Sequence, residues 1–121
     1  MRSERPTAKA RGDRGEALVA DELVRRGCQI LARNFRCRFG ELDLIALDGG
    51  TLCFVEVKLR SETRYGLPRE AVTPAKQRKL RTTAAYYLAT HDCDLPARFD
   101  VAEVYDGAVG NPRVVYWEDA F

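Results

Sequence analysis

The feature that most constrains this chain is a turn, Asp48-Gly49-Gly50-Thr51, between two apolar segments that alternate like β-strands. Glycine accepts the positive φ that a tight hairpin turn requires, so the turn predicts an antiparallel hairpin. Its strands are residues 41–47 and 52–60. A two-residue turn at Gly49-Gly50 pairs residues whose numbers add up to 99, and this register decides which side chains face one another.

That register places two acidic side chains opposite each other. Side chains on a strand alternate between its faces, so Asp43 stands opposite Glu56, and Glu41 stands opposite Lys58 on the same face. Two facing carboxylates repel unless a cation offsets their charge. Lys58 offsets part of it, and a divalent cation offsets more, because two carboxylates with water and phosphate oxygens suit octahedral Mg²⁺. A purely structural alternative, in which Glu41 and Lys58 simply pair across the strands, stays open.

The rest of the chain predicts two helices and three further strands. A first helix is expected over residues 13–26, with Asp13 as its cap and Gly27 as its end. A second helix is expected over residues 73–89, because Thr73 provides a cap and a proline follows it in the first turn. Extended segments are expected at residues 28–38, 98–105 and 113–117, and a loop at residues 61–72.

The predicted order of elements is therefore α-β-β-β-α-β-β. A strand, helix and strand over residues 52–105 should form a right-handed crossover between parallel strands, whereas the hairpin is antiparallel. The fold class is α/β, a mixed β-sheet flanked by helices, and 121 residues suit one domain over residues 13–121. Residues 1–12 are basic and show no hydrophobic period, so they are expected to form a flexible arm.

Charge is unevenly distributed, although the formal net charge is only +2. Residues 58–81 carry eight basic and two acidic side chains, which favours an anionic partner; a solvated basic face is the alternative.

No apolar run is long enough to span a membrane, and no apolar stretch follows the basic start. We therefore expect no membrane partner and a cytoplasmic location. The four cysteines form no C-x-x-C pair, which favours free thiols over a zinc site.

An acid on one strand, a turn and Glu-x-Lys on the next strand resemble the PD-(D/E)xK nuclease superfamily. More narrowly, the chain resembles the YraN family of small bacterial proteins, which is related to archaeal Holliday-junction resolvases. The stretches that carry the resemblance lie within residues 12–105: Gly15-Glu16, Arg33-Asn34-Phe35-Arg36, residues 40–46 and 54–60, Gly66, Glu70-Ala71-Val72, Lys76 and Arg98-Phe99-Asp100-Val101.

The resemblance implies a restriction-endonuclease-like fold and assigns roles to residues. Asp43 and Glu56 would hold Mg²⁺ or Mn²⁺, with the Val57 backbone carbonyl as a further ligand. Lys58 would orient the attacking water and stabilise charge on the phosphoryl group. Glu16 would support the metal site from the first helix; its simpler alternative role is an acid in the first helical turn, favoured by the helix dipole. By analogy with the resolvases, a homodimer is also expected.

The site residues and the family resemblance together predict a nucleic-acid-binding, Mg²⁺-dependent endonuclease that cleaves phosphodiesters. DNA is favoured over RNA as its substrate, and branched DNA is one candidate. The expected contacts to the nucleic acid are Arg60, Lys76, Gln77 and Lys79. The alternative is a non-catalytic nucleic-acid-binding module or adaptor that keeps the nuclease fold.

Overall fold

A computed structural model describes residues 8–60, 72–105 and 112–121. Its elements follow the predicted order: α1 (Ala8–Arg25), β1 (Gln29–Cys37), β2 (Gly40–Asp48), β3 (Thr51–Arg60), α2 (Pro74–Thr90), β4 (Ala97–Tyr105) and β5 (Arg113–Trp117). Residues 1–7 of the expected arm and all of the expected loop except Val72 lie outside the described residues.

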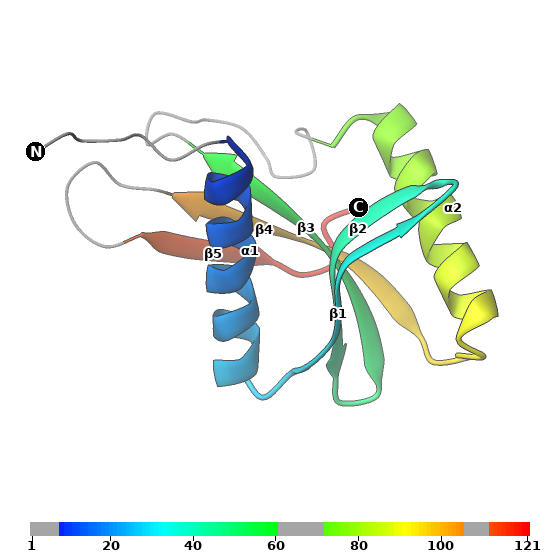
Figure 1. Cartoon of the computed structure of the whole chain (residues 1–121). Helices are drawn as coiled ribbons and strands as arrows, with labels where there is room; N and C mark the ends of the chain where they lie inside the picture. Colours follow the sequence, from blue (N-terminus) through cyan, green and yellow to red (C-terminus); the bar gives the residue numbers. More distant parts are fainter. Residues whose placement is uncertain (1–7, 61–71, 106–111) are drawn as a thin grey trace, which may run out of the picture.

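The five strands form one sheet in the order β1-β2-β3-β4-β5. Strands β3 and β4 are parallel, and α2 connects them; the other neighbouring pairs are antiparallel. Figure 1 shows α1 on one face of the twisted sheet and α2 on the other. The predicted mixed sheet flanked by helices is thus confirmed, and it is compatible with a restriction-endonuclease-like fold.

Helix α1 begins at Ala8, earlier than the expected cap at Asp13. Asp13 lies inside the helix, where its carboxylate forms an i,i+4 ion pair with Lys9 at 3.0 Å. Residues 8–12 are therefore helical, so the prediction that they belong to a flexible arm is wrong. The predicted end is correct: Gly27 has a φ of +92°, and the Cys28 and Gly27 N–H groups bond back to the helix as in a Schellman motif.

Helix α2 starts as its sequence predicts. The Thr73 hydroxyl accepts a hydrogen bond from the Lys76 backbone N–H at 3.2 Å, and Pro74 occupies the first helical position. The helix ends at Thr90, where the His91 N–H donates to the Tyr87 carbonyl.

Each helix covers a separate apolar core. The α1 side is formed by Val19, Ala20, Leu23, Leu44, Ala46, Cys53, Val55, Ala102 and Val104, and the α2 side by Leu42, Ile45, Leu52, Phe54, Val72, Leu80, Ala84, Tyr87 and Val101. Gly15 allows α1 to lie close on the sheet, because a Cβ at this position would come within 2.9 Å of the Leu59 side chain.

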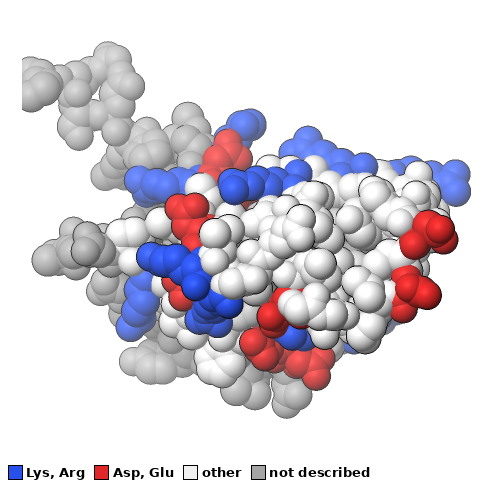
Figure 2. Space-filling model, turned by 90° about the horizontal axis from the view of Figure 1, so that it is seen from below, with Lys and Arg blue, Asp and Glu red and all other residues white. Residues whose placement is uncertain are grey.

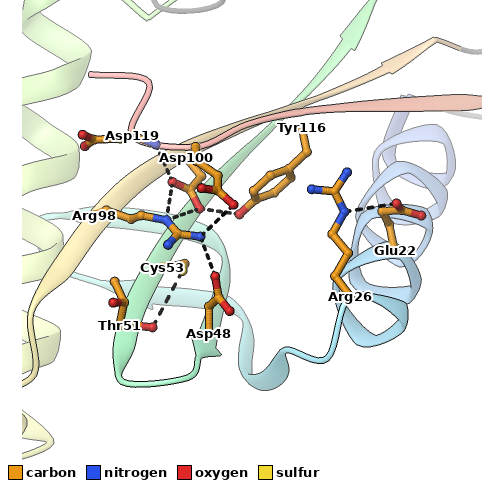
Figure 3. Close-up of polar contacts among 10 residues, drawn as sticks. Glu22, Arg26, Asp48, Thr51, Cys53, Arg98, Asp100, Tyr116 and Asp119 are labelled. Carbon is orange, nitrogen blue, oxygen red and sulfur yellow. Dashed lines mark hydrogen bonds and ion pairs between the residues drawn. The ribbon is translucent and has the colours of Figure 1, made fainter.

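A buried polar network ties the C-terminal strands to the β2–β3 turn (Figure 3). Asp100 is fully buried and accepts hydrogen bonds from the Arg98 guanidinium, the Tyr116 hydroxyl and the Asp119 backbone N–H. Arg98 also donates to Asp48, beside the hairpin turn, at 3.0 Å. Since a buried carboxylate is costly unless it is paired and hydrogen-bonded, Asp100 organises this end of the sheet.

Within the described part of the chain, neither helix combines the length and apolar content that crossing a membrane requires.

Candidate active site

The hairpin has the predicted register. The pairs Leu44–Val55, Ile45–Phe54 and Leu47–Leu52 all follow it. The described pairing of β2 with β3 ends at Leu44, and from there the Asp43 side chain takes over: its Oδ2 accepts a hydrogen bond from the Val57 N–H at 2.8 Å. Asp43 is therefore held against β3 by its carboxylate.

Glu56 lies next to this acid and is only 8% exposed. Its Oε1 lies 2.8 Å from Lys76 Nζ and 3.4 Å from Lys58 Nζ. Lys58 thus lies beside Glu56, as its place two residues along the same strand predicts. The sequence predicted Lys76 as a contact to nucleic acid and did not show that α2 brings it onto Glu56.

Both acids line a cavity of about 590 Å³ between the β1–β2 hairpin and α2. The lining residues are Arg36, Cys37, Gly40, Glu41, Asp43, Glu56, Ala75, Lys76, Lys79, Leu80 and Thr83. Gly40 permits the close approach of hairpin and helix: its φ is +150°, and a Cβ there would lie 3.0 Å from Thr83 Oγ1.

Burial and like charge perturb the ionisation of the site. Burial raises the pKa of the Asp43 carboxyl to about 7, and the Glu56 charge adds to this effect. Burial lowers the pKa of Lys58. For Lys76 burial is the largest single effect and lowers the pKa, but the hydrogen bond to Glu56 and the charges of Glu56 and Asp43 together outweigh it, so the pKa is raised. An acid with so high a pKa beside a second carboxylate marks a site where a bound cation would relieve repulsion.

Glu16 approaches the site from α1. Burial raises the pKa of its carboxyl, while a side-chain hydrogen bond with Asn34 lowers it. Its charge also contributes to the raised pKa of Asp43. Asn34 belongs to a stretch that carries the family resemblance, but the sequence predicted no contact between it and Glu16. Its φ of +53° on β1 suits asparagine better than most residues.

The four predicted contacts to nucleic acid divide into two groups. Lys76 and the exposed Lys79 line the cavity. Arg60 does not: its side chain is 10% exposed and pairs with Glu103 on β4 at 2.9 Å. Gln77 does not line it either, because its amide donates to the Val72 carbonyl at 2.9 Å.

The ion pair of Glu41 with Lys58, which the purely structural alternative requires, is not what the described residues show. Glu41 pairs with Arg36 on the neighbouring strand β1 at 3.2 Å, and Lys58 pairs with Glu56. The reason is that the described β2–β3 ladder ends before Glu41, whereas β1 still pairs with β2 at that position.

The donor set suits a small hard cation. Asp43 and Glu56 supply carboxylate oxygens, and Mg²⁺ is commonly held by one or two carboxylates while keeping several waters. Among the described residues, no cluster of three or more His, Cys, Asp or Glu side chains could hold a metal ion. The two acids therefore fit an ion whose other ligands are water, substrate or backbone oxygens, and the Val57 carbonyl remains a predicted ligand.

Comparison with known proteins places the site within a family. Residues 15–104 match the model of uncharacterised protein family UPF0102, a span that includes every candidate site residue named above. The chain is 51% identical over 111 residues to a UPF0102 protein of Symbiobacterium thermophilum, covering 91% of this chain and 94% of that one. It is 44% identical over 123 residues to one of Geotalea uraniireducens, covering 100% and 97%. The chain belongs to the uncharacterised protein family UPF0102, the YraN family that the sequence motifs resemble.

Proposed function

We propose that this protein is a divalent-metal-dependent nuclease that hydrolyses phosphodiester bonds of nucleic acid, with DNA as the first substrate to test. The observation that carries the proposal is the pair of acids Asp43 and Glu56 in a cavity, with Lys58 and Lys76 at Glu56. Metal-dependent phosphodiester hydrolysis uses acids that hold the metal and a cationic group near the phosphoryl oxygens, and the residues of this cavity fit both roles.

Asp43 and Glu56 would hold Mg²⁺ or Mn²⁺. Bound there, the ion would polarise the scissile phosphate and lower the pKa of a bound water. The hydrogen bond from the Val57 N–H orients the Asp43 carboxylate, and Glu16 adds negative charge from α1.

The two lysines, Lys58 and Lys76, would act on the attacking water and on the phosphate oxygens. Lys58, on the same strand as Glu56, would orient the attacking water and stabilise developing charge on the phosphoryl group. Lys76 balances Glu56 in the structure described. When Glu56 serves as a metal ligand, the Lys76 ammonium becomes available to bind a phosphate oxygen of the substrate.

One observation favours the alternative of a non-catalytic nucleic-acid-binding module. Because Lys76 and Lys58 both lie against Glu56, its charge is compensated by the chain itself. A protein that only binds nucleic acid would use the same cavity with the two lysines as phosphate contacts.

A cleavage assay separates the nuclease from the non-catalytic binding module. Its substrates are labelled single-stranded, duplex, flap and four-way DNAs, with RNA counterparts. We expect products only with Mg²⁺ or Mn²⁺, and we expect Glu56→Gln and Lys58→Met to reduce the rate at least about a hundredfold. Glu118→Gln is the matched control, because Glu118 is 59% exposed and does not line the cavity. Binding of these nucleic acids without cutting, in the presence of Mg²⁺ or Mn²⁺, would establish the adaptor instead.

A further inference from the structure

We infer that nucleic acid enters the cavity as a single strand rather than as a duplex, with a base stacked at Phe39 and phosphates along Arg36, Arg38 and Lys79. This inference rests on the proposed function and specifies the form of nucleic acid that the site accepts.

The depth of the site is the first argument. Glu56 is 8% exposed, so a phosphate must enter the cavity to approach it. The end of the β1–β2 hairpin and the first half of α2 form the walls, and Gly40 nearly touches Thr83. A cavity of 590 Å³ is in the range that admits a small ligand. A stacked duplex is too wide for such a space, whereas an unpaired strand can bend one phosphate into it.

Charge on the β1–β2 wall is the second argument. Arg36 and Arg38 are exposed on this hairpin, and Lys79 is exposed opposite them on α2. The Arg36–Glu41 pair lies at the surface, with side chains 73% and 61% exposed, so its guanidinium can exchange this partner for a phosphate at little cost. On the face drawn in Figure 2, Lys and Arg side chains lie in a row along the upper edge, and most of the acidic side chains lie lower on that face.

Aromatic side chains beside the cavity are the third argument. Phe39 is half-buried in the turn between the lining residues Cys37 and Gly40. Its ring meets Tyr86 of α2 edge-on at 5.6 Å, and the Arg38 guanidinium lies 4.8 Å from its centroid. An aromatic platform with an adjacent cation is the combination that single-strand binding sites use, because every base has a face that stacks.

Binding of a labelled oligonucleotide to the full chain, followed by fluorescence anisotropy in EDTA, tests this inference. The same sequence is offered as a single strand and as a duplex. We expect the single strand to bind at least about tenfold more tightly than the duplex. Phe39→Leu should weaken single-strand binding about tenfold or more, whereas Phe39→Trp should retain it.

A salt series tests the charge contacts. Arg36→Gln should lower the slope of log K against log salt by about 0.7, the value for one phosphate of a single strand. Arg25→Gln is the matched control and should leave the slope unchanged, since Arg25 is 72% exposed and pairs with Glu22 on α1. Duplex binding as tight as single-strand binding, or an unchanged affinity in Phe39→Leu, would overturn the inference.

The outcomes remain separable from those of the cleavage panel, because this assay contains no divalent metal. Metal-dependent cutting together with duplex preference would refute the single-strand inference alone. Single-strand binding together with no cutting would refute the nuclease proposal alone.

Discussion

Asp43 reaches across the hairpin and accepts a hydrogen bond from the Val57 backbone N–H at 2.8 Å. The last described main-chain partners of β2 and β3 are Leu44 and Val55, so the side chain continues the cross-strand bonding where the ladder ends. One oxygen of Asp43 is thereby held in place next to Glu56. The carboxylate is oriented before any ligand arrives, which is the preorganisation that an active site requires.

The ionisation of Asp43 predicts a dependence of stability on pH. Its carboxyl pKa is about 7 in the folded chain and 3.8 as the reference for the unfolded chain, so the folded state binds the proton more tightly. The proton bound to Asp43 therefore stabilises the folded chain. This contribution to the free energy of unfolding is fully present below pH 3.8 and is lost as pH rises through 7. Asp43→Asn retains an acceptor for Val57 and should remove the effect. We measure the free energy of unfolding in urea with EDTA present. Relative to the wild type, the free energy of unfolding of the variant should rise by roughly 2 kcal/mol between pH 5 and pH 8. An identical pH dependence in both proteins would contradict the assignment.

Lys76 should compete with metal for Glu56, because its ammonium lies 2.8 Å from the Glu56 carboxylate. Removing it in Lys76→Met should tighten Mn²⁺ binding by roughly threefold to tenfold while slowing cleavage, because a phosphate contact is lost. Lys79→Met is the control for the Mn²⁺ affinity, which it should leave unchanged, because Lys79 lines the cavity but its described contacts do not include Glu56. Calorimetric titration measures the affinity, and equal values for Lys76→Met and wild type would exclude the competition.

Asp100 should be important for stability rather than for chemistry. Asp100→Asn leaves the Arg98 guanidinium without its fully buried carboxylate partner, and it should lower the free energy of unfolding by about 3 kcal/mol. Asp48→Asn removes the more exposed partner of the same arginine and should cost less than about 1 kcal/mol. Denaturant titration compares the two variants; equal losses would show that burial does not decide the strength of these pairs.

Gly40 should be needed for the approach of the hairpin to α2. In Gly40→Ala the new Cβ would lie 3.0 Å from Thr83 Oγ1, and alanine would be strained at the φ of +150°. We therefore expect the free energy of unfolding to fall by about 1–3 kcal/mol. Gly50→Ala, in the β2–β3 turn, would meet nothing within 4 Å and serves as the control. Thermal unfolding of both variants tests the prediction, and a smaller loss at Gly40 than at Gly50 would refute it.

The hairpin was predictable because a glycine turn and strict alternation set the register of β2 and β3 from local signals alone. The start of α1 was not, because residues 8–12 carry no cap or hydrophobic period. The Lys76–Glu56 contact and the burial of Arg60 against Glu103 depend on how α2 and β4 lie on the sheet. Such contacts join residues far apart in the chain, and periodicity within one element contains no information about them.

Binding of Mn²⁺ to the wild-type chain and to Glu56→Gln is the measurement that tests the central claim most directly. Calorimetry at pH 8 should detect Mn²⁺ binding to the wild type, competed by Mg²⁺, and should show at least about tenfold weaker binding to Glu56→Gln and to Asp43→Asn. Circular dichroism should confirm that the variants are folded. A wild type that binds no Mn²⁺, or two variants that bind it as tightly as the wild type, would contradict the metal site formed by Asp43 and Glu56.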